Sequence, residues 1–430
     1  MNQKSSESSP APPASASWLQ RALRPAVCLF LLSLQPGPWW PRGSGLASGY
    51  VAPPMHASRP LSASVPLRGS PGAGPLGGRH GRKSDVFRRF ESVSRPNGSN
   101  PASERSSPSE KLRHRLSVLW RFTRPHTIIG SALAIPALHL LAAPTYGTAL
   151  TARSLSSMLY AMVPSLLMNL YITGLNQVTD VEIDKINKPD LPIASGDLSV
   201  KDARLLVVGS LVLSLALGAS VPALATEGLG VALGVSAVLG TVYSLPPFRF
   251  KRFPLLAAFC IVAVRGAVIN AGFFAHAHAA AYGGSGRGSV LGCLAGDLRC
   301  GLSSLYFAVF GLVIALMKDV PDVEGDALSN IRTASVRLGP SAVYQAMHRL
   351  LTGLFWGVGL AFFRGALAAP ASAAVRSGRA LVGAAALLAG ASVRREASPV
   401  DPHNPREVYG FYMHLWKLFY LSYLFLPFAR

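Results

Sequence analysis

Residues 176–197 read NQVTDVEIDKINKPDLPIASGD, an acidic stretch that begins where an apolar segment ends. Asn176, Asp180 and Asp184 recur at every fourth position, so a helix would place their side chains along one face. Carboxylate and amide oxygens grouped in this way are typical ligands of a hard divalent cation such as Mg²⁺. The stretch therefore predicts a metal site at the end of a helix that leaves an apolar environment.

Residues 318–326, KDVPDVEGD, repeat this arrangement. Asp322 and Asp326 are again four positions apart, and Asp319 lies about one turn before Asp322. The chain has 20 acidic residues, and half of them fall in two short windows, six in 180–202 and four in 319–326. Solvent-exposed helix ends alone would not concentrate carboxylates in this way. We therefore expect the two windows to serve one site.

The composition is that of a polytopic membrane protein. Half of the 430 residues are hydrophobic and only 14% are charged, a balance typical of chains that cross a bilayer several times. The net charge of +21 would suit a nucleic-acid partner. However, the basic residues are spread over the N-terminal region and short loops, with no basic face interleaved with aromatic residues, so we expect none. The four cysteines form no CxxC pair. Free thiols are expected, with a Cys293–Cys300 disulfide as the alternative.

The N-terminal region predicts a leader rather than a folded domain. Arg21 and Arg24 precede a short apolar run at 26–34, and small residues follow near position 48, so residues 1–49 resemble a signal peptide. Residues 50–115 are basic, rich in Ser and Pro and poor in acids, which predicts a disordered, transit-peptide-like region. Together they resemble a bipartite leader for a plastid reached through the secretory route. One long transit peptide is the alternative.

Residues 116–430 contain apolar segments separated by polar breaks. Several approach the ~20 residues that a membrane-spanning helix needs, so the fold class predicted is an all-α integral membrane protein. We expect nine spanning helices, with one more or fewer as the margin. They lie near 126–144, 155–175, 203–222, 228–245, 254–275, 302–317, 343–363, 379–393 and 411–428.

Successive helices alternate in direction, so the loops after the second, fourth and sixth helices lie on one face. These loops are the first acidic stretch, residues 243–252 (YSLPPFRFKR) and the second acidic stretch. The same face carries most of the basic residues of short loops, which by the positive-inside tendency makes it cytoplasm-like, or stromal in a plastid. These residues are Lys188, Lys201, Arg204, Arg249, Lys251, Arg252, Arg332, Arg337, Arg394 and Arg395.

Acidic clusters ringed by Lys and Arg at the mouth of a helical bundle suit a polyanion with an apolar tail, such as an isoprenoid diphosphate. Mg²⁺ would neutralise charge on the leaving group, and basic side chains would donate charge-assisted hydrogen bonds to its oxygens. Lys318 is expected to contact the diphosphate, with an ion pair to Asp322, four positions later, as the alternative. Tyr243 would contact phosphate or anchor at the membrane interface. Arg265 lies inside an apolar segment, where a charge usually marks a site.

The two acidic stretches resemble the Asp-rich motifs of the UbiA superfamily of membrane prenyltransferases. Further stretches resemble its homogentisate-prenylating branch, and its phytyl-transferring members in particular. They are 120–127 (WRFTRPHT), 261–265 (IVAVR), 331–339 (IRTASVRLG) and 411–420 (FYMHLWKLFY). The resemblance covers residues 116–430 and implies a UbiA-type helical bundle around a central cavity in a plastid membrane. It also implies Mg²⁺-dependent transfer of a phytyl group to homogentisate, with loss of CO₂.

The resemblance also assigns roles to residues. Those implied as metal ligands are Asn176, Asp180, Asp184, Asp319, Asp322 and Asp326, of which Asp180, Asp184, Asp322 and Asp326 are taken as catalytic. Those expected to contact the diphosphate are Asn176, Lys188, Arg249, Lys251, Lys318 and Arg332, and Tyr243 keeps the two roles given above. The homogentisate carboxylate needs a cation, and the candidates are Arg124 and Arg265, with His126 nearby.

Two kinds of alternative stay open. Within the same chemistry, the donor would carry a geranylgeranyl or solanesyl chain, or the acceptor would be another compound such as a chlorophyllide. From another class, a transporter could hold an anionic substrate between its helices. Transporters usually show repeats with sites near the membrane midplane, whereas these acids lie at helix ends on one face.

Overall fold

Long helices make up most of the described chain. The computed structural model describes residues 107–283, 289–368 and 371–430, so the predicted leader lies almost entirely outside it. Residues 108–115, which were expected to be disordered, form the start of a helix. The longer helices are α3 (Pro108–Phe122), α4 (Pro125–Ala142), α5 (Ala152–Thr179), α7 (Val200–Ala219), α8 (Glu227–Ser244), α12 (Leu298–Lys318), α15 (Pro340–Ala368), α16 (Ala373–Ala397) and α17 (Pro405–Phe425).

Shorter helical segments connect or extend these helices. They are α6 (Val181–Asn187), η1 (Phe250–Arg252), α9 (Pro254–Val262), η2 (Ala263–Val268), α10 (Ile269–His276), η3 (Ala277–Ala281), α11 (Val290–Gly296), α13 (Val323–Leu328), α14 (Ala334–Leu338) and η4 (Leu426–Phe428). No strand occurs within the described residues. The fold there is all-α, as the sequence predicts.

Seven helical stretches are long and apolar enough to cross a membrane. Six of them are α4, α5, α7, α8, α12 and most of α15, and the seventh runs from α9 through η3. The predicted number of nine is therefore not confirmed. The eighth and ninth predicted spans lie on α16 and α17, which are long enough to cross a membrane, at 25 and 21 residues. Both are richer in polar residues: α16 includes Arg379, Arg394 and Arg395, and α17 includes Glu407 and His414.

Hydroxyl side chains fix the starts of three spanning helices. The Oγ1 atom of Thr151 accepts a hydrogen bond from the Ser154 backbone N–H at the start of α5. Ser199 and Thr226 accept equivalent bonds at the starts of α7 and α8. Each satisfies a backbone donor that lacks a partner inside the helix. These caps explain why the helices begin where the apolar segments do.

The fifth spanning helix is longer than predicted and is interrupted by two π-helical turns. It continues from Pro254 to Ala281, and η2 and η3 are its π-helical parts. A π turn leaves carbonyls without their usual partners. The Asn270 side chain donates to the carbonyls of Arg265 and Gly266, at 2.5 and 2.8 Å. The π turn that carries Arg265 is thereby stabilised from within its own helix.

A glycine lets this π turn approach α12 closely. A Cβ atom on Gly266 would lie 2.5 Å from the Cβ of Ala308 and 2.7 Å from its Cα. These distances leave no room for a side chain. The close approach fixes the position of Arg265 relative to α12.

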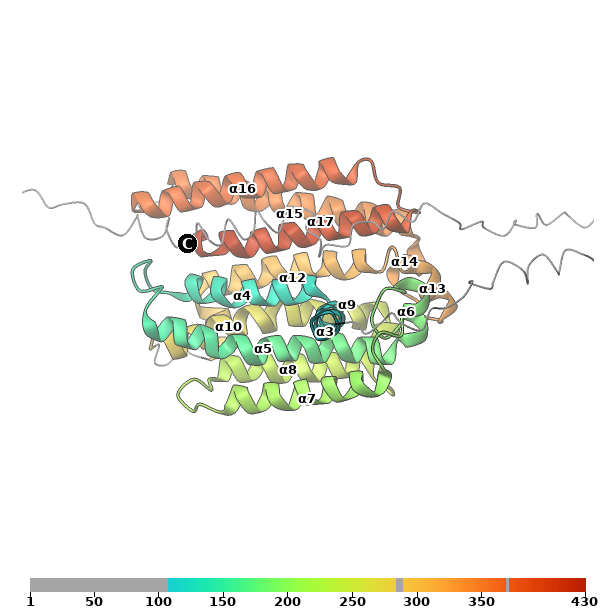
Figure 1. The fold of residues 1–430 in the computed structure, drawn as a ribbon. Helices are drawn as coiled ribbons and strands as arrows, with labels where there is room; N and C mark the ends of the chain where they lie inside the picture. The colour runs from blue at the N-terminus through green and yellow to red at the C-terminus, as the bar shows by residue number, and fades with distance from the viewer. Residues whose placement is uncertain (1–106, 284–288, 369–370) are drawn as a thin grey trace, which may run out of the picture. The chain divides into compact units, whose positions relative to one another are not determined.

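The C-terminal ends of α5, α8 and α12 meet at one end of the bundle, as the alternation of helix direction predicts. Figure 1 shows α6 and α13 grouped at that end and the C-terminus at the other. Contacts join α6 to α13, and α8 to η1. The two acidic stretches are therefore adjacent in space. None of the three described cysteines, Cys260, Cys293 and Cys300, forms a disulfide with another, as expected.

Candidate active site

The first acidic cluster lies at the junction between α5 and α6. Asp180 breaks the helix between them, with φ −118° and ψ 19°. The Asn176 amide donates to Asp180 Oδ2 at 2.8 Å. One turn later, Asp184 on α6 is only 5% exposed. The predicted spacing thus brings all three side chains to one end of the bundle, even though the helix is not continuous.

Two cations from the loop after α8 hold Asp180. Arg249 Nη2 lies 3.1 Å from Asp180 Oδ1, and Lys251 forms an ion pair with the same oxygen. Lys251 is 7% exposed, and its burial lowers its pKa to about 8, although Asp180 opposes this shift. Arg249 and Lys251 thus place two basic side chains against one oxygen of the first cluster.

The second cluster follows α12 and touches the first. Lys188, which follows α6, forms an ion pair with Asp322, and Asp322 is 5% exposed. Lys318 Nζ lies 3.5 Å from Asp319 Oδ1. Asp326 on α13 is also buried. Both predicted clusters therefore converge, with lysines between them.

Three of these carboxyls are harder to ionise than an exposed aspartate. Burial is the main cause that raises the pKa of Asp184 and Asp319 above 3.8. It also raises the pKa of Asp326 to about 7, and the neighbouring carboxylates of Asp319 and Asp322 add to the shift. Oδ2 of Asp184 is buried without a hydrogen-bond partner, and Arg124 Nη2 stands 3.9 Å away. A divalent cation would supply the missing positive charge.

The donor set fits Mg²⁺ only if the ligand completes the coordination. Among the described residues, no three His, Cys, Asp or Glu side chains are grouped closely enough to hold a metal by themselves. Mg²⁺ commonly binds through one or two carboxylates, with substrate phosphates and waters filling the remaining positions. Asp180 and Asp184 on one side, and Asp319, Asp322 and Asp326 on the other, are suited to that role.

Two arginines at this site adopt a left-handed backbone conformation. Arg124 has φ 50° and Arg249 has φ 40°, which costs a residue with a Cβ roughly 1–2 kcal/mol. Each guanidinium faces one acid of the first cluster, Asp184 and Asp180 respectively. Backbone strain that places a charged side chain is a feature of functional sites.

A cavity of ≈ 200 Å³ adjoins the acidic clusters and extends between the helices. Its lining includes six predicted site residues, namely Arg124, His126, Asn176, Tyr243, Arg265 and Lys318. Lys318 Nζ donates to the Tyr243 hydroxyl at 3.3 Å. The cavity thus has a charged rim on the side of the acids and a mostly apolar interior.

Aromatic side chains of α17 form one wall of this cavity. The Arg265 guanidinium lies 4.8 Å from the ring centroid of Trp416, a cation–π contact. The His126 ring lies 5.1 Å from the Trp416 ring. Trp416 therefore positions two of the three residues predicted for the acceptor carboxylate.

Arg332 is the predicted site residue that the structure leaves apart. Its side chain is exposed, and it makes no hydrogen bond or ion pair with any described residue. Its position in the chain, shortly after the second acidic stretch, gave no information on the direction of its side chain.

Sequence reasoning missed several residues of the site. Asn169 lines the cavity and pairs with Thr127 and Ser131 on α4, its Oδ1 accepting from Thr127 Oγ1 at 3.0 Å. Asn169 precedes Asn176 by seven positions, two helical turns, and that spacing was the available signal. Trp416 lies in the aromatic stretch 411–420, whose period of four was visible.

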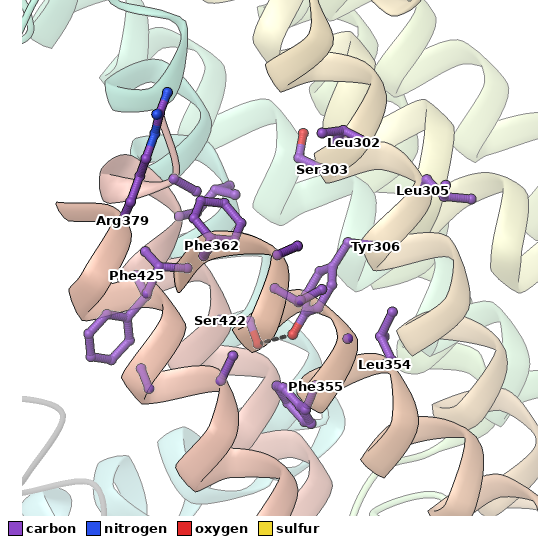
Figure 2. A pocket seen from close by; sticks show the side chains of 18 of the residues that line it. Leu302, Ser303, Leu305, Tyr306, Leu354, Phe355, Phe362, Arg379, Ser422 and Phe425 are labelled. Carbon is purple, nitrogen blue, oxygen red and sulfur yellow. Dashed lines mark hydrogen bonds between the residues drawn. The ribbon is translucent and has the colours of Figure 1, made fainter. Parts of the chain in front are cut away.

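A second and larger cavity contains none of the predicted site residues. It measures ≈ 640 Å³ and lies among α12, α15, α16 and α17. Figure 2 shows its apolar side chains, with a hydrogen bond of 2.8 Å between Tyr306 and Ser422. Like the smaller cavity, it has no carboxylate among its lining residues. Unlike that cavity, it includes none of the residues beside the acidic clusters, such as Asn176 and Lys318.

Comparison with known proteins identifies the family. Residues 133–418 match the UbiA prenyltransferase family. Homogentisate phytyltransferase of Synechocystis sp. is 38% identical over 324 residues, covering 73% of this chain and 96% of that protein. Homogentisate phytyltransferase 1, chloroplastic, of Arabidopsis thaliana is 36% identical, with coverage of 77% and 80%. Homogentisate geranylgeranyltransferase of Triticum aestivum is 36% identical, with coverage of 75% and 74%. The chain belongs to the UbiA prenyltransferase family.

Proposed function

We propose that this protein transfers a phytyl group from phytyl diphosphate to homogentisate, with loss of CO₂. The observation that carries the proposal is the meeting of two acidic clusters and their lysines at the rim of one apolar cavity. An isoprenoid diphosphate has the matching chemistry, with several negative charges at one end and a hydrocarbon chain. The names of the similar proteins support the acceptor, and family membership favours an enzyme over a transporter.

The donor headgroup would lie between the two clusters. Mg²⁺, when bound, would neutralise charge on the diphosphate as it leaves. Lys188 and Lys251 would exchange their carboxylate partners for diphosphate oxygens, and Arg249 and Lys318 would add hydrogen bonds. Asp180 and Asp322 would then be free to hold the metal. The chain of the donor would follow the apolar cavity, where little water could reach the reacting carbon.

The acceptor would lie beside the donor with its carboxylate on Arg124 or Arg265. The bond between the donor carbon and the diphosphate oxygen breaks, and a bond forms from that carbon to the aromatic ring. The ring loses one proton, the side-chain carboxylate leaves as CO₂, and the remaining carbon gains one proton to become a methyl group. The product is a methyl-phytyl-benzoquinol.

The direct test supplies a membrane preparation with labelled homogentisate and one of three donors, phytyl, geranylgeranyl or solanesyl diphosphate. The product mass then identifies the chain transferred. The proposal expects the phytyl product to form fastest. A faster geranylgeranyl product would favour the second candidate, which the similarity to the wheat enzyme supports, and no product from any donor would remove the function.

We place the protein in a plastid membrane, with the acidic face toward the stroma. Two observations support this: the chloroplastic relative and the basic residues around the acidic clusters. Protease accessibility of an epitope tag inserted near Asp190 in intact thylakoid or envelope vesicles would test the orientation.

A further inference from the structure

A neutral hydrogen bond joins the two acidic loops next to the charged site. Asn187 is the last residue of α6, and its Oδ1 accepts from the backbone N–H of Gly325 on α13 at 3.1 Å. The two residues are 138 positions apart in the chain. Gly325 is buried and Asn187 is half-buried, so this bond is partly shielded from solvent.

The close approach requires a glycine at position 325. A Cβ atom there would lie 2.2 Å from Asn187 Oδ1, 2.6 Å from Cγ and 2.7 Å from Nδ2. All three atoms belong to a short side chain on a helix, which cannot move away without withdrawing from the bond. The Asn187 side chain therefore occupies the space that a side chain at position 325 would fill.

The other described link between the loops is the ion pair of Lys188 with Asp322. Both of its members are assigned to the donor and its metal, so ligand binding would break it. The Asn187–Gly325 bond uses an amide and a backbone N–H, and neither is assigned to a ligand. It can persist when the ion pair does not.

We propose that Asn187 is a positioning residue, and that its bond to Gly325 sets the separation of the two acidic clusters before and during ligand binding. The expected effect on donor binding rests on the proposed function, which assigns both clusters to one headgroup. The structural claim is independent of that function: loss of this bond loosens α13 from α6 in the ligand-free protein.

Spin labels can measure that looseness without any activity. Cysteines would replace the exposed residues Glu182 on α6 and Ala327 on α13, in a Cys28→Ser background, since the other cysteines are buried. Pulsed electron resonance on the metal-free protein in detergent then gives the distance distribution. We expect a narrow distribution with Asn187 present and a clearly broader one in Asn187→Ala. Asn187→Asp keeps the acceptor oxygen and should stay narrow.

A double substitution separates a specific contact from general misfolding. Gly325→Ala alone should broaden or shift the distribution because of the clash, whereas Gly325→Ala combined with Asn187→Ala removes the clash. Since the two residues touch, their effects should be non-additive, and the double variant should unfold at a higher temperature than Gly325→Ala alone. If the change in Tm of the double variant equals the sum of the changes in the two single variants, the proposal is overturned.

The affinity for a donor analogue connects the Asn187–Gly325 bond to the proposed site. Mg²⁺-dependent binding of phytyl thiolodiphosphate, which resists ionisation, should weaken about 10- to 100-fold in Asn187→Ala, the range typical for residues that orient metal ligands. Lys185→Ala, an exposed neighbour on α6, is the matched control and should bind normally. An unchanged distance distribution in Asn187→Ala would contradict the claim that the Asn187–Gly325 bond holds α13 to α6. An absence of Mg²⁺-dependent binding in the unsubstituted protein contradicts the proposed function instead.

Discussion

Lys188, which follows α6, forms an ion pair with Asp322, 134 residues later in the chain. The pair joins the two acidic stretches directly, so they belong to one site rather than to two. A lysine between carboxylates occupies the position that a metal ion or a diphosphate would need. In the ligand-free protein Lys188 neutralises Asp322. We expect a bound metal–diphosphate complex to take over that role, with the metal on Asp322 and the diphosphate on Lys188.

Asp180, which pairs with Arg249 and Lys251, and Asp322, which pairs with Lys188, should be essential for turnover. We expect Asp180→Asn and Asp322→Asn each to lower the turnover number by about 10²–10³-fold, because a metal-bound leaving group is worth several kcal/mol of transition-state stabilisation. Initial rates of labelled homogentisate conversion measure this. Glu182→Gln and Glu324→Gln, exposed residues of the same two stretches, are the controls and should remain active. Near-normal turnover in both aspartate variants would refute the metal assignment.

The two cavity arginines should affect the acceptor rather than the donor. Arg124→Ala or Arg265→Ala should raise the KM for homogentisate about 10- to 100-fold, since a hydrogen-bonded charge contributes roughly 1.5–3 kcal/mol. The KM for phytyl diphosphate should change little in Arg265→Ala, and less than the KM for homogentisate in Arg124→Ala, where Arg124 also faces Asp184. Arg204→Ala, an exposed arginine of α7 on the same face, is the control. If both cavity variants keep the normal KM for homogentisate, its carboxylate binds elsewhere.

The pKa of Asp326, raised to about 7, predicts a pH dependence. A carboxyl whose folded-state pKa is raised contributes stability below its unfolded pKa, near 4, and loses it as the pH rises through about 7. The Tm of the metal-free protein should therefore fall between pH 4 and 7. Mg²⁺ binds the ionised carboxylate, so the rise in Tm on adding Mg²⁺ should be larger at pH 8 than at pH 6.

Two variants test the source of that pH dependence. Asp326→Asn removes one of three carboxyls with a raised pKa and should reduce both the fall in Tm and the difference in the Mg²⁺ effect. Asp190→Asn, at an exposed position after α6, should leave both unchanged. A Mg²⁺ effect of equal size at pH 6 and pH 8 in the unsubstituted protein would exclude Asp326 as the group responsible.

The close contact between η2 and α12 predicts a packing defect. In Gly266→Ala the added Cβ would lie 2.5 Å from that of Ala308, and overpacking of this kind costs about 1–3 kcal/mol. We expect a lower Tm in detergent and, because Arg265 is in the same turn, a higher KM for homogentisate. Gly209→Ala on α7, where a Cβ meets no atom within 4 Å, should not lower the Tm. Equal Tm values for the two variants would contradict the packing argument.

The parts of the fold that periodicity controls were predictable from the sequence. The spacing of Asn176, Asp180 and Asp184 placed them at one helix end, and the alternation of helix direction brought Arg249 and Asp322 to the same face. Both arguments depend on local geometry and on chain connectivity alone. The meeting of these residues at one end of the bundle reflects those two simple constraints.

The remaining features depend on tertiary contacts that no local pattern encodes. The left-handed conformation of Arg124 and the π turn at Arg265 arise where packing overrides helical preference. The Asn187–Gly325 bond needs two loops to meet at a separation that only the fold defines. Nine spanning helices were predicted, and seven stretches of the described chain meet the criteria of length and apolarity. The polar residues of α16 and α17 keep these two helices out of that count.

Equilibrium binding of labelled phytyl diphosphate to the purified protein, without acceptor and with or without Mg²⁺, tests most directly whether the two clusters hold one headgroup. The account predicts Mg²⁺-dependent binding that is lost in Asp180→Asn and equally lost in Asp322→Asn. Full Mg²⁺-dependent binding after either substitution would show that one cluster suffices, and would contradict the shared site.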